Sequence, residues 1–208
     1  IQTAKLKAEY KFAVLTYGAR KCNSVESWDE ISQRGGHVFD YIGTIVMVDN
    51  WLPNFDMNEQ MKMDKRIPEN LQKITADISG RRRWHEPVTE EERRQHQGFM
   101  RRSGLDPEVG FLMKSEKCFI VTDACIDCGF CTYVCPRGNY ELASRGVQMS
   151  GDCEFCFACI QNCPQKAIQF RRSEDGSFSD GTEKNPNARY RNEHISLMDL
   201  KLANNQKL

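Results

Sequence analysis

The chain carries Cys125-Ile126-Asp127-Cys128-Gly129-Phe130-Cys131-Thr132-Tyr133-Val134-Cys135-Pro136, and 28 positions further on it carries Cys153-Glu154-Phe155-Cys156-Phe157-Ala158-Cys159-Ile160-Gln161-Asn162-Cys163-Pro164. Both segments follow one pattern: three cysteines separated by two residues each, then a fourth after three residues, directly before proline. Eight of the ten cysteines belong to these two copies. A pattern that occurs twice in full indicates one unit with approximate internal two-fold symmetry.

This spacing is the one found where thiolates hold iron–sulfur cubes in bacterial ferredoxins. Three closely spaced cysteines let one loop surround three corners of a cube, and backbone N–H groups of that loop tune the reduction potential. The fourth cysteine lies too far along to close on the same cube, and the proline turns the chain away, so it ligates the other cluster. We therefore predict two 4Fe–4S clusters, the first on Cys125, Cys128, Cys131 and Cys163, and the second on Cys153, Cys156, Cys159 and Cys135.

Two other uses of cysteine remain as alternatives. Paired C-x-x-C elements also build tetrahedral zinc sites, but zinc ribbons normally have a longer separation between two pairs. Disulfides are disfavoured because such closely spaced cysteines have poor geometry for several independent bridges. The complete double pattern favours clusters.

The composition limits the remaining choices of partner and compartment. Lys+Arg and Asp+Glu both number 29, so no bulk charge would attract nucleic acid or an anionic membrane. The longest apolar stretch, Tyr41 to Val48, is too short to span a bilayer, and no secretory signal is visible. Thiolate-bound clusters favour a reducing cytoplasm and anaerobic conditions. Because the chain opens on Ile1 and not on Met, we expect an upstream segment.

Residues 1–80 have the pattern of a parallel α/β layer. Strands are predicted at Tyr10–Tyr17 and Val38–Val48. A helix capped by Ser24 is expected to end at Gly35-Gly36, and a second begins at Ile67-Pro68 with an apolar face. The methionines between them are expected to form a helix face against the sheet: Met57, Met61 and Met63.

The rest of the chain divides into three further regions. Residues 81–117 read as a charged helical connector. Residues 118–170 hold the two-cluster unit, a small α+β fold with short strands at Phe119–Val121 and Ala167–Phe170. Residues 171–208 read as a loop and a short terminal helix capped by Ser196.

Beyond the cysteines, the chain resembles the anaerobic two-domain iron–sulfur flavoproteins, in which a flavodoxin-like domain precedes a two-cluster ferredoxin. The resemblance covers nearly the whole chain, although only the cysteine motifs are highly specific. It is carried by both motifs and by Phe12-Ala13-Val14-Leu15-Thr16-Tyr17-Gly18, Met47-Val48-Asp49-Asn50-Trp51 and Asn187-Ala188-Arg189-Tyr190-Arg191-Asn192. Two departures are visible: the family's phosphate loop and first three strands are absent, and Val48 replaces a usual proline.

The resemblance implies that residues 1–80 are the C-terminal portion of a flavodoxin-like domain. It places Thr16, Tyr17 and Gly18 beside the ring of FMN in the full-length protein, whereas the plain reading is a strand-to-helix turn with Gly18 at positive φ. The interpretation is an electron carrier that passes single electrons through two clusters between redox donor and acceptor proteins. The alternatives are a flavin-dependent reductase, or an iron–sulfur subunit whose sheet is completed by a partner chain or a second copy.

Overall fold

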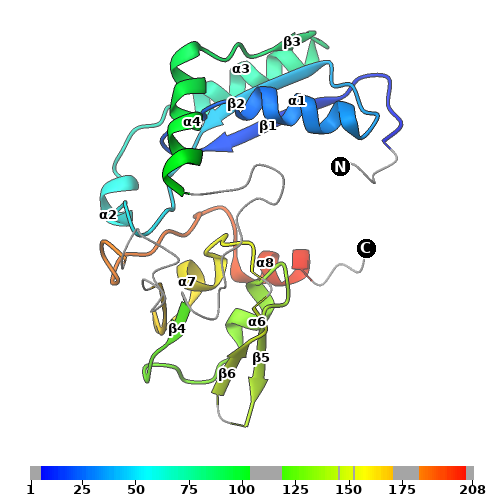
Figure 1. Ribbon diagram of the computed structural model, residues 1–208. Helices are drawn as coiled ribbons and strands as arrows, with labels where there is room; N and C mark the ends of the chain where they lie inside the picture. The colour runs from blue at the N-terminus through cyan, green and yellow to red at the C-terminus, as the bar shows by residue number, and fades with distance from the viewer. Residues whose placement is uncertain (1–5, 104–118, 145, 152, 171–182, 205–208) are drawn as a thin grey trace. The chain divides into compact units, whose positions relative to one another are not determined.

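The computed structural model describes residues 6–103, 119–144, 146–151, 153–170 and 183–204 (Figure 1). The chain forms two compact units, which are described separately. The first comprises Ile1–Asp49 with Met63–Phe111, and the second comprises Asn50–Lys62 with Leu112–Leu208. Within the described ranges, no helix has the length and apolar character that a membrane crossing requires.

The first unit is built on a small parallel sheet. Its strands are β1 (Phe12–Tyr17), β2 (Tyr41–Val46) and β3 (Trp84–His85), in the order β1-β2-β3, and both neighbouring pairs are parallel. The prediction of two parallel strands is confirmed, and β3 is an addition to it. A small core on this sheet consists of Ala13, Val25, Phe39, Ile42 and Val88.

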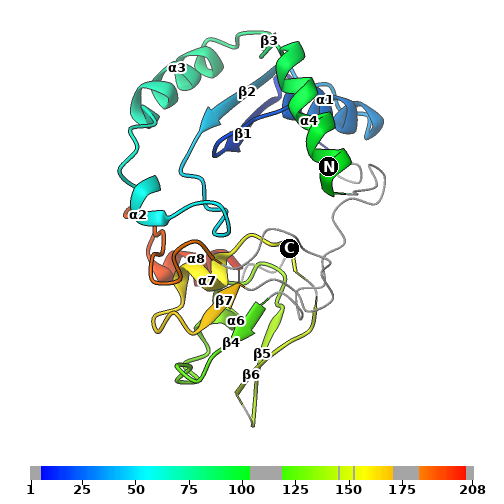
Figure 2. The same ribbon diagram turned by 60° about the vertical axis from the view of Figure 1, so that its left-hand side comes forward.

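Two helices lie on opposite faces of the parallel sheet (Figures 1 and 2). Helix α1 (Ser24–Arg34) ends at Gly35, and α3 (Ile67–Ser79) has Pro68 in its first turn, as predicted. The predicted cap at Ser24 is wrong, because Asn23 holds the N-cap position and Ser24 is already helical. Helix α3 has no buried residue, and Leu71 on its predicted apolar face is 47% exposed.

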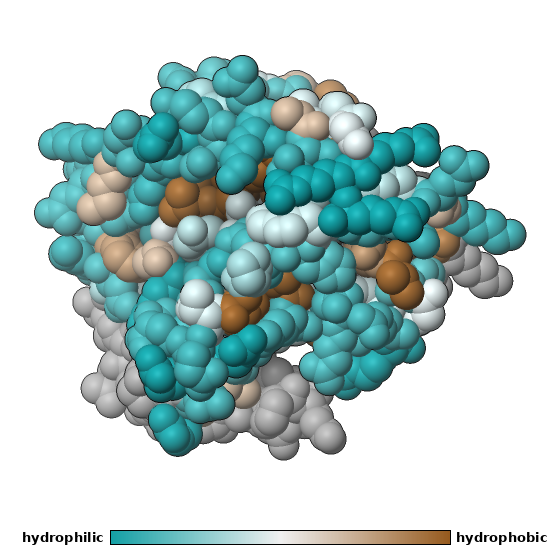
Figure 3. All heavy atoms as spheres, turned by 90° about the horizontal axis from the view of Figure 1, so that it is seen from above, coloured by the Kyte–Doolittle hydropathy of each residue, from teal (hydrophilic) through white to brown (hydrophobic). Residues whose placement is uncertain are grey.

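The face of the molecule in Figure 3 is mostly hydrophilic, with small separate hydrophobic areas. Single exposed apolar side chains are normal on protein surfaces and do not by themselves mark an interface. Phe12 and Val38 of the first unit are such residues, at 50% and 65% exposure. We therefore base no docking site on them.

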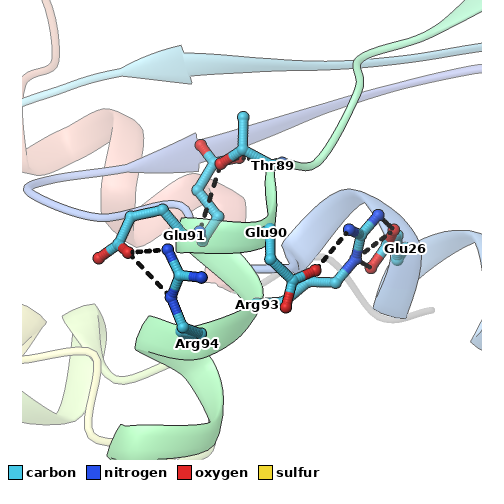
Figure 4. Close-up of polar contacts among 7 residues, drawn as sticks. Glu26, Thr89, Glu90, Glu91, Arg93 and Arg94 are labelled. Atoms are coloured by element: carbon cyan, nitrogen blue, oxygen red, sulfur yellow. Dashed lines mark hydrogen bonds and ion pairs between the residues drawn. The ribbon is translucent and has the colours of Figure 1, made fainter.

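Helix α4 (Glu90–Ser103) lies in the region predicted as a charged helical connector. It begins with a reciprocal cap, in which the Thr89 hydroxyl accepts from the Glu92 N–H and the Glu92 carboxylate accepts from the Thr89 N–H. Arg93 then joins α4 to α1 through an ion pair with Glu26 at 2.6 Å, while Arg94 pairs with Glu91 (Figure 4). These exposed pairs orient the helix and contribute little to stability.

The second unit contains two antiparallel strand pairs and two short helices. Strand β4 (Phe119–Val121) pairs with β7 (Ile168–Phe170), and both were predicted. Strand β5 (Tyr140–Ala143) pairs with β6 (Gly146–Met149), a hairpin that the sequence reading missed. The helices are α6 (Phe130–Val134) and α7 (Ala158–Asn162).

The 28-residue repeat of the sequence is reproduced in the backbone of the second unit. Helix α6 shifted by 28 positions is α7, and the pair Phe119–Phe170 corresponds to the pair Val147–Leu142. Left-handed φ values also recur at this interval. They are 52° for Asp127 and 51° for Phe155, and 68° for Gly129 and 59° for Phe157. The third pair is Gly138 at 61° and Lys166 at 52°. The unit therefore has the internal two-fold symmetry that the cysteines predict.

Residues far away in the sequence complete the core of the second unit. Helix α2 (Met57–Gln60) contributes Met57, which is fully buried in this core together with Leu52. The expected methionine face against the parallel sheet is therefore wrong for Met57. Trp51 packs on Phe157 and Phe170, with ring centroids 5.1 and 6.0 Å apart.

The tail from residue 183 to 204 is held on the same unit by hydrogen bonds. The Lys184 N–H donates to the Leu52 carbonyl at 2.9 Å, and the Asn185 amide donates to Asp56 at 2.7 Å. Helix α8 (Leu197–Asn204) follows, and Ser196 caps it through Asp199 as predicted. The tail, to which the sequence reading gave no role, is thus part of the folded unit.

Candidate metal centre

Four cysteines from the two motifs line one cavity of the second unit. Cys125, Cys128 and Cys131 come from the first motif, and Cys163 comes from the second. The cavity is otherwise apolar or backbone-lined, by Val121, Gly129, Phe130, Val147, Pro164, Ala167 and Ile168. The fourth cysteine of one motif thus lies with the first three of the other, as the ligand assignment requires.

Within the described residues, no group of three His, Cys, Asp or Glu side chains is arranged to hold a single metal ion. Ligands of a 4Fe–4S cube bind separate iron atoms and must stand further apart than the ligands of one zinc ion. The donor set of four thiols fits a cluster.

The remaining cysteines of the motifs form a second group. Burial raises the pKa of Cys159 to about 12, and the nearby Cys156, Cys153 and Cys135 add to the increase. Burial likewise raises the pKa of Cys156, with a further contribution from Cys135. Cys135 of the first motif therefore lies close enough to interact with the second motif's cysteines.

One deeply buried thiol in each group, Cys131 and Cys159, holds its proton when no iron is bound. Burial raises the pKa of Cys131 to about 11, and none of the described cysteines forms a disulfide. Metal ligation requires thiolates, so cluster binding must release these protons and offset the burial of negative sulfur.

Backbone N–H groups point at the sulfurs in a symmetric arrangement. The Asn139 N–H donates to Cys135 Sγ at 3.3 Å, and the Ala167 N–H, 28 positions on, donates to Cys163 Sγ at 3.2 Å. The Phe155 N–H donates to Cys153 Sγ at 3.3 Å. Such donors stabilise thiolate charge and tune a bound cluster.

The loops that aim these groups contain strained backbone. Phe155 and Phe157 adopt left-handed φ values that bulky residues rarely take. Each such residue costs about 1–3 kcal/mol, and such strain concentrates at functional sites. At the position equivalent to Phe157 the first motif has Gly129, where an added Cβ would approach Leu142 Cδ1 to 2.9 Å.

Aromatic side chains pack around the motif cysteines. Phe157 is buried and packs with Phe119 and Phe170, at centroid distances of 5.8 and 5.5 Å. Phe155 packs on Phe119 at 5.3 Å, and Phe130 lines the first cavity. Tyr133 differs from these residues, because it is 39% exposed and carries Lys201 Nζ over its ring.

Tyr140 is a site residue that the sequence reading missed. Its hydroxyl donates to Cys159 Sγ at 3.2 Å inside the core, and both side chains are buried. Burial raises the pKa of Tyr140, so the hydroxyl keeps its proton. Aligning the two halves of the 28-residue repeat would have revealed this position, because Tyr140 then stands opposite the apolar Ile168 and is the one of the two with a polar group.

The expected flavin-contacting turn lies at the carboxyl end of β1. Thr16 is exposed, Tyr17 accepts the Met47 N–H at 2.7 Å, and Lys65 Nζ donates to the Gly18 carbonyl at 3.2 Å. Gly18 does not have the positive φ that the plain reading gave it. Instead, an added Cβ would overlap the Asp49 side chain.

Replacing Gly18 by alanine is expected to destabilise the first unit. The methyl group would displace Asp49 or push the turn away, and overpacking of this kind costs about 1–3 kcal/mol. Denaturant unfolding followed by far-UV circular dichroism measures the loss. Gly36→Ala tests backbone strain alone, because its φ is 77° and nothing lies within 4 Å of its added Cβ.

Comparison with known proteins supports the assignment of the second unit. The family described as "4Fe-4S dicluster domain" matches residues 117–164, which include both cysteine motifs. Pyruvate synthase subunit PorD of Methanothermobacter marburgensis is 36% identical over 62 residues, covering 29% of this chain and 73% of that protein. The chain therefore belongs, through this segment, to the 4Fe–4S dicluster family, and the segment is a ferredoxin-type electron-transfer domain that binds 4Fe–4S centres.

Two further relatives are similar to part of the chain. A ferredoxin of Pyrobaculum islandicum is 39% identical over 59 residues, covering 27% of this chain and 55% of that protein. The probable anaerobic dimethyl sulfoxide reductase chain YnfG of Escherichia coli is 29% identical over 84 residues, covering 35% of this chain and 40% of that protein. No solved structure matches the chain.

Proposed function

We propose that the chain carries single electrons through two 4Fe–4S clusters, each held by three cysteines of one motif and the fourth cysteine of the other. One set is Cys125, Cys128, Cys131 and Cys163, and the other is Cys153, Cys156, Cys159 and Cys135. When bound, each cluster supplies a one-electron couple. The chain's own residues orient the thiolates, donate N–H groups to sulfur and exclude water.

The observation that carries this proposal is the cavity shared by the two motifs. Cys163 lines it beside Cys125, Cys128 and Cys131, although at least 32 positions of sequence separate it from them. Cys135 contributes to the raised pKa of both Cys156 and Cys159, which supports the second set. Sharing ligands in this way ties both halves of the repeat into one folded unit.

The test is anaerobic reduction of the iron-loaded chain. The proposal expects uptake of about two electrons per chain, electron paramagnetic resonance signals of reduced clusters, and stoichiometric return of the electrons to a one-electron dye. A chain that takes up no electrons, or only one, contradicts the proposal. Cys22→Ala is the matched control, because Cys22 lies outside both motifs and in the first unit.

A second candidate is coupling to FMN in a longer protein, either as a carrier or as a flavin-dependent reductase. The position of Thr16, Tyr17 and Gly18 at the carboxyl end of a parallel strand favours it, because α/β sheets bind ligands at that edge. Absence of flavin from the anaerobically purified product of the complete gene would remove this candidate.

A third candidate is an iron–sulfur subunit of a larger oxidoreductase, with redox proteins as donor and acceptor. Among the described residues, β1 has one pairing neighbour and is therefore an edge strand that a partner chain or a second copy could extend. Two relatives are subunits or chains of oxidoreductases by their names. The oligomeric state of the purified protein by light scattering tests this candidate, and a monomer that transfers electrons argues against it.

A further inference from the structure

We propose that Tyr140 and Asp127 set the two cluster sites at different reduction potentials, so that the site of Cys153, Cys156, Cys159 and Cys135 is the more oxidising one. The inference rests on the proposed two-cluster function. It assigns an order to the two sites, so that electrons move downhill from the first to the second.

Tyr140 makes the second site easier to reduce. Its hydroxyl donates to Cys159 Sγ at 3.2 Å, and a donor on a ligating sulfur stabilises the extra negative charge of the reduced state. The contact is buried, with Tyr140 4% and Cys159 8% exposed, and a low local dielectric strengthens it. The equivalent position in the other half is Ile168, which has no donor.

Asp127 makes the first site harder to reduce. Its carboxylate Oδ1 lies 3.6 Å from Cys125 Sγ, where the unligated thiol donates to it. A ligating thiolate has no proton to donate, so the carboxylate becomes a nearby negative charge that opposes reduction. The equivalent residue in the other half is the uncharged Phe155. Because the contact is solvent-exposed, salt weakens this effect more than that of Tyr140.

Among the described residues, two other features near the sulfurs are matched between the halves, and one nearby carboxylate is paired. The N–H groups of Asn139 and Ala167 occupy equivalent positions on the two fourth cysteines. The backbone N–H of Asp127 lowers the pKa of Cys125, but burial and the Asp127 side chain raise it more. This N–H is the equivalent, 28 positions earlier, of the Phe155 N–H that donates to Cys153 Sγ. Glu154, beside the second set, is paired with Arg137 at 3.4 Å.

The test is a redox titration of the full iron-loaded chain, followed by electron paramagnetic resonance. In Tyr140→Phe, the higher of the two midpoint potentials is expected to become more negative, while the lower one stays in place. A tenfold change in the ratio of oxidised to reduced cluster corresponds to about 59 mV for a one-electron couple, and we expect a shift of this order. Tyr190→Phe is the matched control, because Tyr190 packs on the same core and is expected to leave both potentials unchanged.

Asp127→Asn supplies an independent variant with the opposite effect. It is expected to raise the lower potential and leave the higher one in place, and the shift should shrink at high salt. The gap between the clusters therefore narrows in both variants, but from opposite ends. Unchanged potentials in Tyr140→Phe, a shift of the lower potential there, or loss of iron relative to wild type would overturn the inference. Fewer than two reducible clusters in the wild-type chain would instead overturn the proposed function.

Discussion

Replacing Cys163 by alanine is expected to remove the cluster of the first motif, although Cys163 belongs to the second. Cys163 lines the cavity formed with Cys125, Cys128 and Cys131, so its loss leaves that site with three thiolates. The variant should retain about four of about eight irons per chain. Iron analysis and electron paramagnetic resonance of the reduced protein measure the change.

The identity of the lost cluster follows from a comparison of variants. Cys163→Ala should give the same residual spectrum as Cys125→Ala, whereas Cys135→Ala should match Cys153→Ala. If Cys163→Ala matched Cys153→Ala instead, each motif would hold its own cluster and the exchanged ligand assignment would be wrong. Because the two halves of the unit are approximately symmetric, the Cys163 and Cys135 substitutions remove equivalent ligands, and each comparison serves as the control for the other.

Replacing Arg189 by alanine is expected to lower the free energy of unfolding of the second unit by about 3–5 kcal/mol, the usual cost of leaving one member of a buried ion pair unpaired. Arg189 Nη1 lies 2.9 Å from Glu183 Oε2, with the two side chains only 7% and 2% exposed. Arg189 also donates to the Ile160 carbonyl, and Glu183 accepts the Phe170 N–H. The pair therefore joins the tail to α7 and β7.

The loss of stability in Arg189→Ala should depend on pH. Burial raises the pKa of Glu183, although the Phe170 N–H and Arg189 partly offset it. A raised folded pKa contributes stability that is full below the unfolded value of about 4.3 and is lost as pH rises through the folded value. Without Arg189 the pKa of Glu183 rises further, so the defect should be larger at neutral pH than under mildly acidic conditions.

Denaturant unfolding of the iron-loaded protein at two pH values, followed by cluster absorbance, measures this effect. Arg191→Ala is the matched control: this nearby arginine makes an exposed hydrogen bond to the Asn162 carbonyl and should change stability little. Glu183→Gln combined with Arg189→Ala should recover part of the loss, because no unpaired charge remains. Equal stability of Arg189→Ala and wild type would mean that the tail does not stabilise the unit.

The elements with strong local signals were predictable from the sequence. The double cysteine pattern indicated the ferredoxin-type unit, and apolar runs bounded by glycine or proline indicated β1, β2 and α3. Ser24 failed as a cap because Asn23 takes that position in the folded chain. The hairpin β5–β6 has a weak strand pattern of its own, and only the 28-residue repeat would have pointed to it.

The contacts that could not be predicted join residues far apart in the sequence. Met57 packs in the ferredoxin-type core, and Arg189 reaches Ile160 and Glu183, but no periodicity links these positions. The hydrogen bond from Tyr140 to Cys159 likewise depends on the tertiary fold, which brings a residue of β5 to a residue of α7. Gly18 was identified as a special position, but for the wrong reason, since the proximity of Asp49 requires the fold of the first unit.

The central claim is that the eight motif cysteines hold two 4Fe–4S clusters, and the most direct measurement is the iron, acid-labile sulfide and zinc content of the anaerobically purified chain. The prediction is about eight irons and about eight sulfides per chain, with no stoichiometric zinc. Zinc without sulfide would contradict the claim and make the motifs structural zinc sites.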